Sequence, residues 1–533
     1  MTRLIRRLAV AALLTGLAAQ AQAEDRFDLL IRGGLVFDGG LGEAAQADVG
    51  VRGDRIVLVG PAPAGSVADK VIDARGLWVT PGFIDPHTHY LADLTAADAA
   101  RRALPAALLQ GVTTVFVGND GTSHGAGVGD LFHRAQTRGV GPNIASYVGF
   151  GTVRRQVMGE ADRPASDEER TRMKALVGQA MCDGAIGLST GLFYAPQSYA
   201  ATDEVVVLAR EAGRHGGLYD THLRDESSYG EGLEAAVEEA LNVGRAADIP
   251  VHIAHIKALG VDVHGLAPAV IARIEAAQRA GMRVHADQYP WDASGTALGA
   301  ALLPRWAQAD GEAAMLARLD DPVQLARIRV EMADNLRRRG GAEALLLTAG
   351  APDEVRGLTL AQAAMLWSLD PVDAAVRVLR DGGSSVASFN QTEADIRAFM
   401  TRPWVMTSSD ASAGHPRRYA SFARLYDLYV RGEAVLTPQA FVHRSTALTA
   451  NTFGLEGRGR LTPGAYADVA VFDPERFSPQ ATYLEPEQPA VGMRHVVVNG
   501  RLAVTNGELA SLLAGVPLPR ELPKKCPGHM SDD

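Results

Sequence analysis

The sequence of 533 residues predicts an α/β fold: a (β/α)8 barrel of the TIM type, a small β-sandwich domain formed by both chain ends, and a helical insertion between strands 7 and 8. Eight short apolar runs, separated by helical stretches, predict the barrel. Similar antiparallel-strand patterns at the two chain ends predict the second domain. A long Arg-, Ala- and Leu-rich stretch between the last two apolar runs predicts the insertion, because it is too long for an ordinary loop.

The first residues, 1–23, have the pattern of a signal peptide for export. Three arginines precede an apolar core at 8–19, and the small residues at 21–23 fit a cleavage site. An N-terminal anchor that stays attached is the alternative, but this core is too short to span a bilayer. We therefore expect a mature periplasmic or secreted protein that begins near Glu24, with no stable membrane insertion after cleavage.

Short strands joined by turns are predicted at both ends of the mature chain. Residues 24–80 contain alternating apolar runs broken by Gly-Gly, Gly-Asp and Pro, and matching runs return in 455–515. Because these strands flank a body of different pattern, we expect the two ends to form one β-sandwich domain with the body inserted between them.

The body, residues 81–454, alternates strand and helix patterns, which is typical of a parallel sheet. Within it, residues 297–400 have a helical pattern, and we interpret them as an insertion or lid over the site, although a long crossover helix pair would have a similar pattern. The eight candidate strands are GFIDPHTH, VTTVFVGND, IASYVGF, AIGLSTG, GLYDTH, VHIAHIK, RVHADQYP and WVMTSSD.

Charge and cysteine content exclude some classes of protein. The net charge of −10 and the pI near 5.8 leave no basic stripe, so we expect no nucleic-acid partner. The two cysteines, Cys182 and Cys526, are too few for a disulfide framework, and because the second lies in a polar tail we expect no bridge between them.

Histidines and carboxylates gather at the carboxyl ends of the candidate strands, the face on which such barrels build active sites. His87 and His89 have a spacing of two, which places both imidazoles on one side of an extended segment. Alone, such a pair is equally consistent with one buried, hydrogen-bonded histidine and one exposed one. The other candidates at strand ends are Asp120, His222, His255 and Asp410. Four histidines and two carboxylates at one end of a barrel indicate a hydrolytic site for one or two divalent cations.

These residues resemble the amidohydrolase superfamily and, more narrowly, the N-acyl-D-amino-acid deacylases (D-aminoacylases). The resemblance covers nearly all of 27–505, with the local segments GLSTGLFYAP, THLRDE, HIAHIK, DQYPWDAS, SSD followed by HPR, and GRLTPGAYADVAVFD. It implies Zn²⁺ ligands at His87, His89, His222 and His255, a catalytic aspartate at Asp410, and substrate contacts at Tyr194, Lys257, Tyr289 and Arg417. The family's serine contact has Ser294 or Thr296 as its substitute here.

One position departs from the family pattern. Where the deacylases usually carry a cysteine ligand, this chain has Asp120, and the fourth run, AIGLSTG, has no lysine that could bridge two metals. A carboxylate is a harder ligand than a thiolate and can bridge two cations through its two oxygens. We expect Asp120 to be a metal ligand; the alternative is that it only orients a ligand histidine.

The expected activity is that of an exported, metal-dependent amidohydrolase that cleaves N-acyl-D-amino acids. Metal-activated water would attack the amide, with Asp410 as base and then acid. Arg417 would hold the substrate carboxylate by two hydrogen bonds, unless it is a solvated loop arginine. A dipeptidase, a hydantoinase-like hydrolase of cyclic amides and a non-catalytic metal-binding homologue are the alternatives, and the acyl group, amino acid and oligomeric state stay open.

Overall fold

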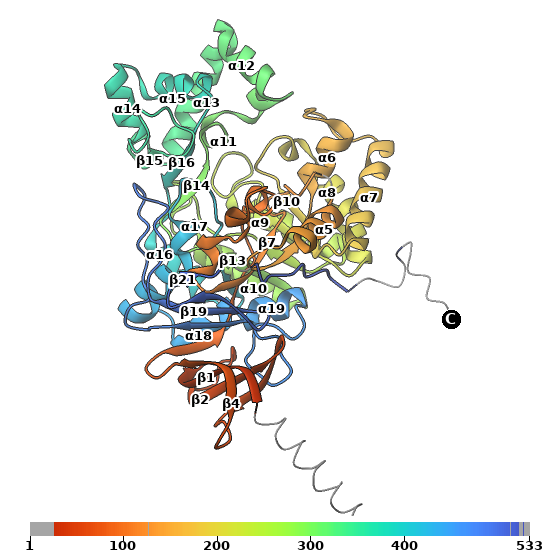
Figure 1. Cartoon of the computed structure of the whole chain (residues 1–533). Coiled ribbons are helices and arrows are strands. Elements are labelled where there is room, and N and C mark those ends of the chain that lie inside the picture. Colours follow the sequence, from red (N-terminus) through yellow and green to blue (C-terminus); the bar gives the residue numbers. More distant parts are fainter. Residues whose placement is uncertain (1–25, 126, 512, 522–525, 527–533) are drawn as a thin grey trace, which may run out of the picture.

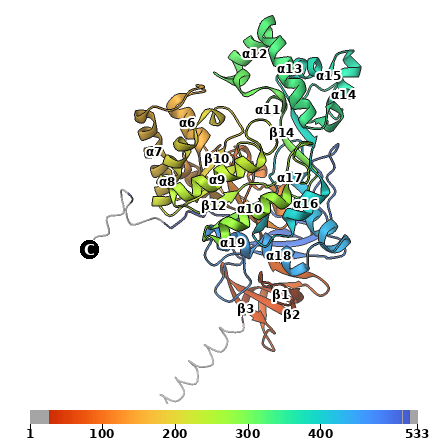
Figure 2. The same cartoon turned by 180° about the vertical axis from the view of Figure 1, so that it is seen from behind.

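The computed structural model describes residues 26–125, 127–511, 513–521 and 526, so the expected signal peptide lies outside the described residues. A central barrel separates a β domain at one end of the molecule from the insertion at the other (Figures 1 and 2). Among the helices described, none has the length and apolar character needed to cross a membrane.

The two chain ends meet in one nine-stranded sheet, the expected β domain. Strand β5 pairs in parallel with β1 from the N-terminal side and antiparallel with β18 from the C-terminal side. Fully buried apolar side chains such as Ile31, Val49 and Val471 form its core. The strands are β1 (Arg26–Val36), β2 (Ala45–Arg52), β3 (Arg55–Gly60), β4 (Val67–Asp73), β5 (Trp78–Pro81), β18 (Val469–Phe472), β19 (Met493–Val498), β20 (Arg501–Thr505) and β21 (Glu508–Leu509).

All eight apolar runs form parallel strands of the barrel, paired in the orders β6-β7-β8 and β9-β10-β11-β12-β13-β17. The ladder between the first and last strands is limited to the residues just after them: the backbone N–H of Asp410 donates to His87 O (3.0 Å), and that of His89 donates to Ala411 O (3.1 Å). The strands are β6 (Phe83–Asp85), β7 (Val112–Val117), β8 (Asn143–Ser146), β9 (Val148–Gly149), β10 (Gly187–Gly191), β11 (Leu218–His222), β12 (Val251–Ile253), β13 (Val284–Gln288) and β17 (Val405–Thr407).

Amphipathic helices cover the barrel. Helix α7 begins with a capping box in which Ser166 and Glu169 satisfy each other's backbone N–H groups, and α8 buries Val205, Leu208 and Ala212 at helical spacing. The helices around the barrel are α2 (Leu91–Leu94), α3 (Ala99–Arg102), α4 (Pro105–Leu108), α5 (Val128–Arg138), α6 (Phe150–Met158), α7 (Asp167–Cys182), the 3-10 turn η1 (Gln197–Tyr199), α8 (Thr202–Arg214), α9 (Leu233–Ala247), α10 (Ala267–Arg279), α16 (Glu393–Met400), α17 (Arg417–Arg424), the π-helix η4 (Leu425–Gly432), α18 (Pro438–Ser445) and α19 (Ala447–Phe453).

The sequence pattern predicted a helical insertion, but the insertion also contains strands. A three-stranded antiparallel sheet, ordered β14-β16-β15, supports its helices over a separate apolar core, and α16 packs on α10 of the barrel instead. The sequence pattern of these short strands does not distinguish them from helices, and only their pairing with one another defines them. The elements are β14 (Ala293–Ala297), α11 (Leu298–Leu302), η2 (Arg305–Gln308), α12 (Glu312–Asp320), α13 (Pro322–Arg338), η3 (Ala342–Ala344), β15 (Leu345–Leu347), α14 (Leu360–Trp367), α15 (Pro371–Arg380) and β16 (Ser385–Phe389).

The expectation of two unbridged cysteines is wrong. Cys182, at the end of α7, forms a disulfide with Cys526, 344 residues later. The chain after the β domain returns along the outside of the barrel, where the backbone N–H of Leu518 donates to Ile144 O and that of Arg520 to Gly184 O. This return brings the tail cysteine to α7, and the polar composition of the tail gave no sign of it.

Candidate functional site

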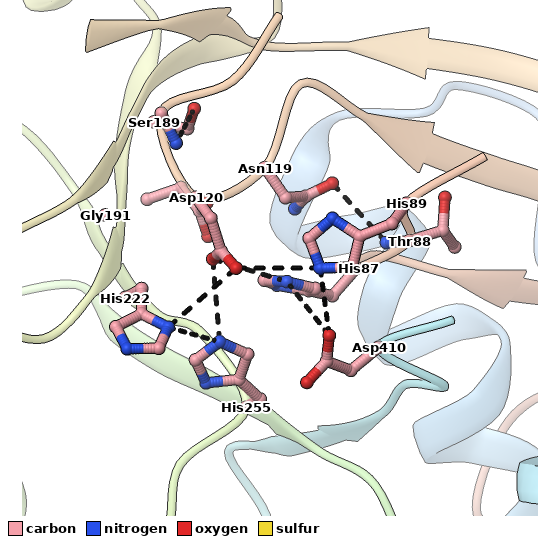
Figure 3. Close-up of polar contacts among 12 residues, drawn as sticks. His87, Thr88, His89, Asn119, Asp120, Ser189, Gly191, His222, His255 and Asp410 are labelled. Carbon is pink, nitrogen blue, oxygen red and sulfur yellow. Dashed lines mark hydrogen bonds and ion pairs between the residues drawn. The ribbon is translucent and has the colours of Figure 1, made fainter. Parts of the chain in front are cut away.

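The structure brings all six predicted ligands together at the carboxyl ends of the barrel strands (Figure 3). His87 and His89 follow β6, Asp120 follows β7, and His222 is the last residue of β11. His255 and Asp410 lie just beyond β12 and β17. The four imidazoles and two carboxylates therefore come from five different strand ends.

Asp120 lies at the centre of this cluster (Figure 3). Its Oδ1 is 3.4 Å from His87 Nε2 and 3.5 Å from His255 Nε2. Its Oδ2 is 3.6 Å from His89 Nε2 and 3.8 Å from His222 Nδ1. Each oxygen of one carboxylate thus faces two imidazole nitrogens, a placement suited to a ligand shared between two cations.

Asp410 joins the histidine pair to Arg417. Its Oδ1 is 3.0 Å from His89 Nε2, and its Oδ2 is 2.7 Å from Arg417 Nη1. Burial by itself would raise the pKa of Asp410, but the Arg417 guanidinium and the nearby histidines outweigh burial and hold this pKa far below its usual range. Asp410 is therefore ionised, with one oxygen beside His89 and the other beside Arg417.

Three of the clustered residues have left-handed backbone conformations: Asp120 at φ 54°, His255 at 33° and Asp410 at 48°. Such angles are costly for residues other than glycine and persist where the surroundings impose them. Around Asp120 that constraint is visible, because Gln197 Nε2 donates to Asp120 O (2.9 Å) and Ser189 Oγ accepts from Gly121 N (3.1 Å). Gln197 belongs to no motif of its own, so the sequence did not single it out.

Two of the barrel strands end earlier than the sequence pattern predicted. The sequence pattern placed His87 and His89, and likewise His255 and Lys257, within strands, but β6 ends at Asp85 and β12 at Ile253. The chain turns there, and the side chains converge through the turns. Asp85 fixes the first turn, because its Oδ1 accepts from His87 N (3.3 Å) and from Ser409 N (3.0 Å).

Lys257 is paired with a carboxylate that the sequence analysis did not single out. Its Nζ lies 2.6 Å from Glu226 Oε1 and 2.8 Å from His255 Nδ1. Glu226 Oε2 lies 3.7 Å from His222 Nε2. Glu226 thus contacts the outer nitrogens of two ligand histidines, the position of a carboxylate that orients metal ligands. Its presence in the THLRDE segment was the available signal.

The four predicted substrate contacts line one cavity of about 330 Å³ together with the metal-ligand cluster, Ser294 and Thr296. Arg417 is 2% exposed, which excludes a solvated loop arginine, and its Nη2 donates to Ser412 Oγ (2.9 Å) and Gly295 O (3.2 Å). Its guanidinium lies 5.0 Å from the centre of the Tyr289 ring. Residues of the insertion, including Ser385 and Val386, complete the wall.

The cluster fits a divalent cation. Both ring nitrogens of His87 and Oδ1 of Asp120 are buried without a hydrogen-bond partner among the described residues, which is costly unless something else satisfies them. One ligand atom each of His87, Asp120 and His255 lie within 4.8 Å of one another. Imidazole nitrogens with carboxylate oxygens are the donor set of zinc and related ions. The alternative of a hydrogen-bonded core histidine therefore fails for His87.

Comparison with known proteins places this geometry in context. The model of the amidohydrolase family matches residues 70–504. A D-aminoacylase of Alcaligenes xylosoxydans xylosoxydans is 33% identical over 503 residues, which cover 89% of this chain and 94% of that protein. A solved D-aminoacylase, studied for the role of its binuclear metal center, has a TM-score of 0.79 and 32% identity, covering 93% of this chain and 100% of the other. An N-acyl-D-glutamate deacylase from Bordetella bronchiseptica, solved with zinc and a phosphonate mimic of the tetrahedral intermediate, has the same TM-score of 0.79 and 30% identity, with coverage of 93% and 100%.

Proposed function

We propose that this chain, which belongs to the amidohydrolase family and is a metal-dependent hydrolase of linear amide bonds, cleaves N-acyl-D-amino acids to a carboxylate and a free D-amino acid. The observation that carries the proposal is the single cavity in which the Asp120-centred cluster, Asp410 and Arg417 meet. Such a site combines ligands for a divalent metal ion, a carboxylate that can act as a base, and an arginine that can bind the carboxylate of the substrate.

The cluster would hold one or two Zn²⁺ or other divalent ions, with Asp120 as a ligand in the place of a thiolate. Each oxygen of Asp120 faces two imidazoles, and this arrangement supports a role for Asp120 as a ligand shared by two cations. The bound cation supplies polarisation of the amide carbonyl and lowers the pKa of a water molecule from about 15.7 towards 7. The ligands of the cluster are His87, His89, Asp120, His222, His255 and Asp410.

Asp410 moves the proton in this scheme. Its ionised carboxylate accepts a proton from the attacking water and returns it to the amide nitrogen as the C–N bond breaks. The contacts to His89 and Arg417 on its two oxygens fix its orientation. One carboxylate thus serves as base and then as acid.

The α-carboxylate of the substrate would lie at Arg417, between the hydroxyls of Tyr194 and Tyr289. Its charge complements Arg417, which lines the cavity together with Tyr194 and Tyr289. Lys257, held by Glu226, lies 5.7 Å from the centre of the Tyr289 ring and adds positive potential to the cavity. Arg417→Ala should therefore raise KM for N-acyl amino acids, and unchanged KM would contradict this placement.

We also propose that the protein acts in the periplasm or outside the cell. The signal-peptide pattern at 1–23 and the Cys182–Cys526 disulfide both support export, because disulfides form and persist in oxidising compartments. Cell fractionation, with determination of the N-terminus of the mature chain, tests this. Retention in the cytoplasm with an intact N-terminus would contradict it.

The experiment for the activity is a hydrolysis screen with the zinc-loaded full chain. The panel holds N-acetyl D- and L-amino acids, dipeptides and hydantoins, and metal content is measured on the same sample. We expect turnover of the N-acetyl-D-amino acids and little of their L-enantiomers. Preference for hydantoins or dipeptides would replace the proposed substrate class, and an inert protein that binds no divalent ion would indicate a non-catalytic homologue.

A further inference from the structure

The structure places a fully buried carboxylate, Asp287 of β13, next to two of the six metal ligands. Asp287 is not among the described residues that line the cavity, so its role is not contact with the substrate. A buried charge is costly unless hydrogen bonds or opposite charges compensate for it. Within the described ranges, the side chains that pair with this carboxylate are two histidines, His87 and His252, with no lysine or arginine.

One oxygen of Asp287 holds the turn that presents His255. Its Oδ1 accepts from the backbone N–H of His255 (3.1 Å), and its backbone carbonyl accepts from the N–H of Ile256 (2.8 Å). His255 has a left-handed backbone (φ 33°), which is costly unless the surroundings impose it. Asp287 therefore does for the turn at His255 what Asp85 does for the turn at His87.

The other oxygen of Asp287 lies near two imidazoles. Its Oδ2 is 2.7 Å from His252 Nε2 and 3.9 Å from His87 Nδ1. The opposite nitrogen of the His87 ring, Nε2, is 3.4 Å from Asp120 Oδ1. His87 Nδ1 has no hydrogen-bond partner among the described residues, so Asp287 Oδ2 is a carboxylate oxygen that faces an unsatisfied ring nitrogen.

Binding of a cation by His87 decides where the proton of its ring lies. An imidazole nitrogen that holds a cation carries no proton, so the proton of the neutral ring lies on the other nitrogen. A cation beside Asp120 would take Nε2 of His87 and leave the proton on Nδ1, the nitrogen that faces Asp287. A buried N–H without an acceptor is costly, and at metal sites a carboxylate commonly accepts from such a ring.

We propose that Asp287 is a positioning residue of the metal centre: it accepts the Nδ1–H of His87 and the backbone N–H of His255, and so directs both ligands towards the cation. His252 keeps the carboxylate in this orientation through its contact with Oδ2. Glu226 already lies 3.2 Å from the outer nitrogen of His255, and Asp287 gives His87 the corresponding support. The inference rests on the metal-binding part of the proposed function and not on the identity of the substrate.

Asp287→Asn tests this role, because three N–H groups meet the carboxylate and an amide offers them only one oxygen. The NH2 group of asparagine would face either the backbone N–H of His255 or the ring N–H of His87, donor against donor. We expect Zn²⁺ affinity, measured by competition with a chromogenic chelator, to fall by about 10- to 100-fold. The absorption bands of bound Co²⁺ should also shift, because the ligand geometry changes. Unchanged zinc affinity with an unchanged Co²⁺ spectrum would overturn the proposal.

Asp220 supplies the matched control. It is as fully buried as Asp287 and lies in β11 of the same sheet, but the histidine nitrogen that it faces is His252 Nε2, at 4.0 Å. Asp220→Asn makes the same chemical change and should keep the zinc affinity of wild type. Thermal unfolding of the metal-free proteins checks that both variants fold. An equal loss of zinc affinity in both variants would indicate a general effect of buried acids and would overturn the positioning role.

A crystal structure of the zinc-loaded wild type decides the question if Asp287→Asn does not fold. His87 Nδ1 should then lie about 2.7–3.2 Å from Asp287 Oδ2, a hydrogen-bond distance, and a separation that stays at 3.9 Å would overturn the proposal. The zinc titration also separates this inference from the function on which it rests. Equal zinc affinity of wild type and Asp287→Asn refutes only the positioning role, whereas a wild type that binds no divalent ion refutes the metal centre and this role together.

Discussion

Replacement of Asp120 by asparagine tests the centre of the site most directly. The change keeps the shape of the side chain, removes its charge, and turns one oxygen into an NH2 group that faces two imidazoles. Two unit charges about 4 Å apart interact by about 4 kcal/mol at an effective dielectric constant of 20. Loss of the carboxylate should therefore weaken binding of a divalent cation by about a thousandfold.

The assay is competition for Zn²⁺ against a chromogenic chelator, with metal stoichiometry measured separately, so that it does not depend on activity. Glu226→Gln is the matched comparison, because Glu226 touches His222 and His255 from their outer sides and should cost only about 10- to 100-fold. Asp120→Cys with Co²⁺ adds a spectroscopic signature, since a thiolate ligand introduces charge-transfer absorption that wild type lacks. If Asp120→Asn matches Glu226→Gln in affinity and keeps the wild-type stoichiometry, Asp120 only orients its neighbours and the ligand assignment is refuted.

Three further changes probe chemistry and stability. Asp410→Asn should lower turnover by about 10²- to 10⁴-fold with metal content nearly intact; single-turnover rates check this, and wild-type rates would exclude the proton-transfer role. Gly121→Ala should lower the free energy of unfolding by about 1–3 kcal/mol, because Gly121 has φ 72° and a Cβ there would lie 1.9 Å from Gln197 Oε1. Gly65→Ala, at φ 87° in open space, is its control in thermal unfolding and should cost less; equal losses would show that the contact with Gln197 has no effect. Cys182→Ser should lower stability by about 2–4 kcal/mol under oxidising conditions and make unfolding insensitive to a reductant, whereas equal reductant sensitivity of both proteins would argue against the disulfide.

Sequence by itself determined the barrel and the set of polar residues at its mouth. Each barrel strand is a short, buried apolar run, so it can be recognised from its own sequence. The candidate metal ligands and catalytic residues directly follow these runs. Parallel strands place their carboxyl ends at one edge, and for that reason Asp120, His222 and Asp410 could be assigned to one site before any distance was known.

Tertiary structure alone decided how these residues meet. Three contacts join segments that are distant in the sequence and have no local pattern that predicts the contact. They are the ion pair of Glu226 with Lys257, the hydrogen bond from Gln197 to Asp120 and the Cys182–Cys526 disulfide. The short strands of the insertion likewise depend on partners distant in the chain. Periodicity reports which face of an element is buried, whereas a hydrogen bond depends on which distant atoms come within a few ångströms.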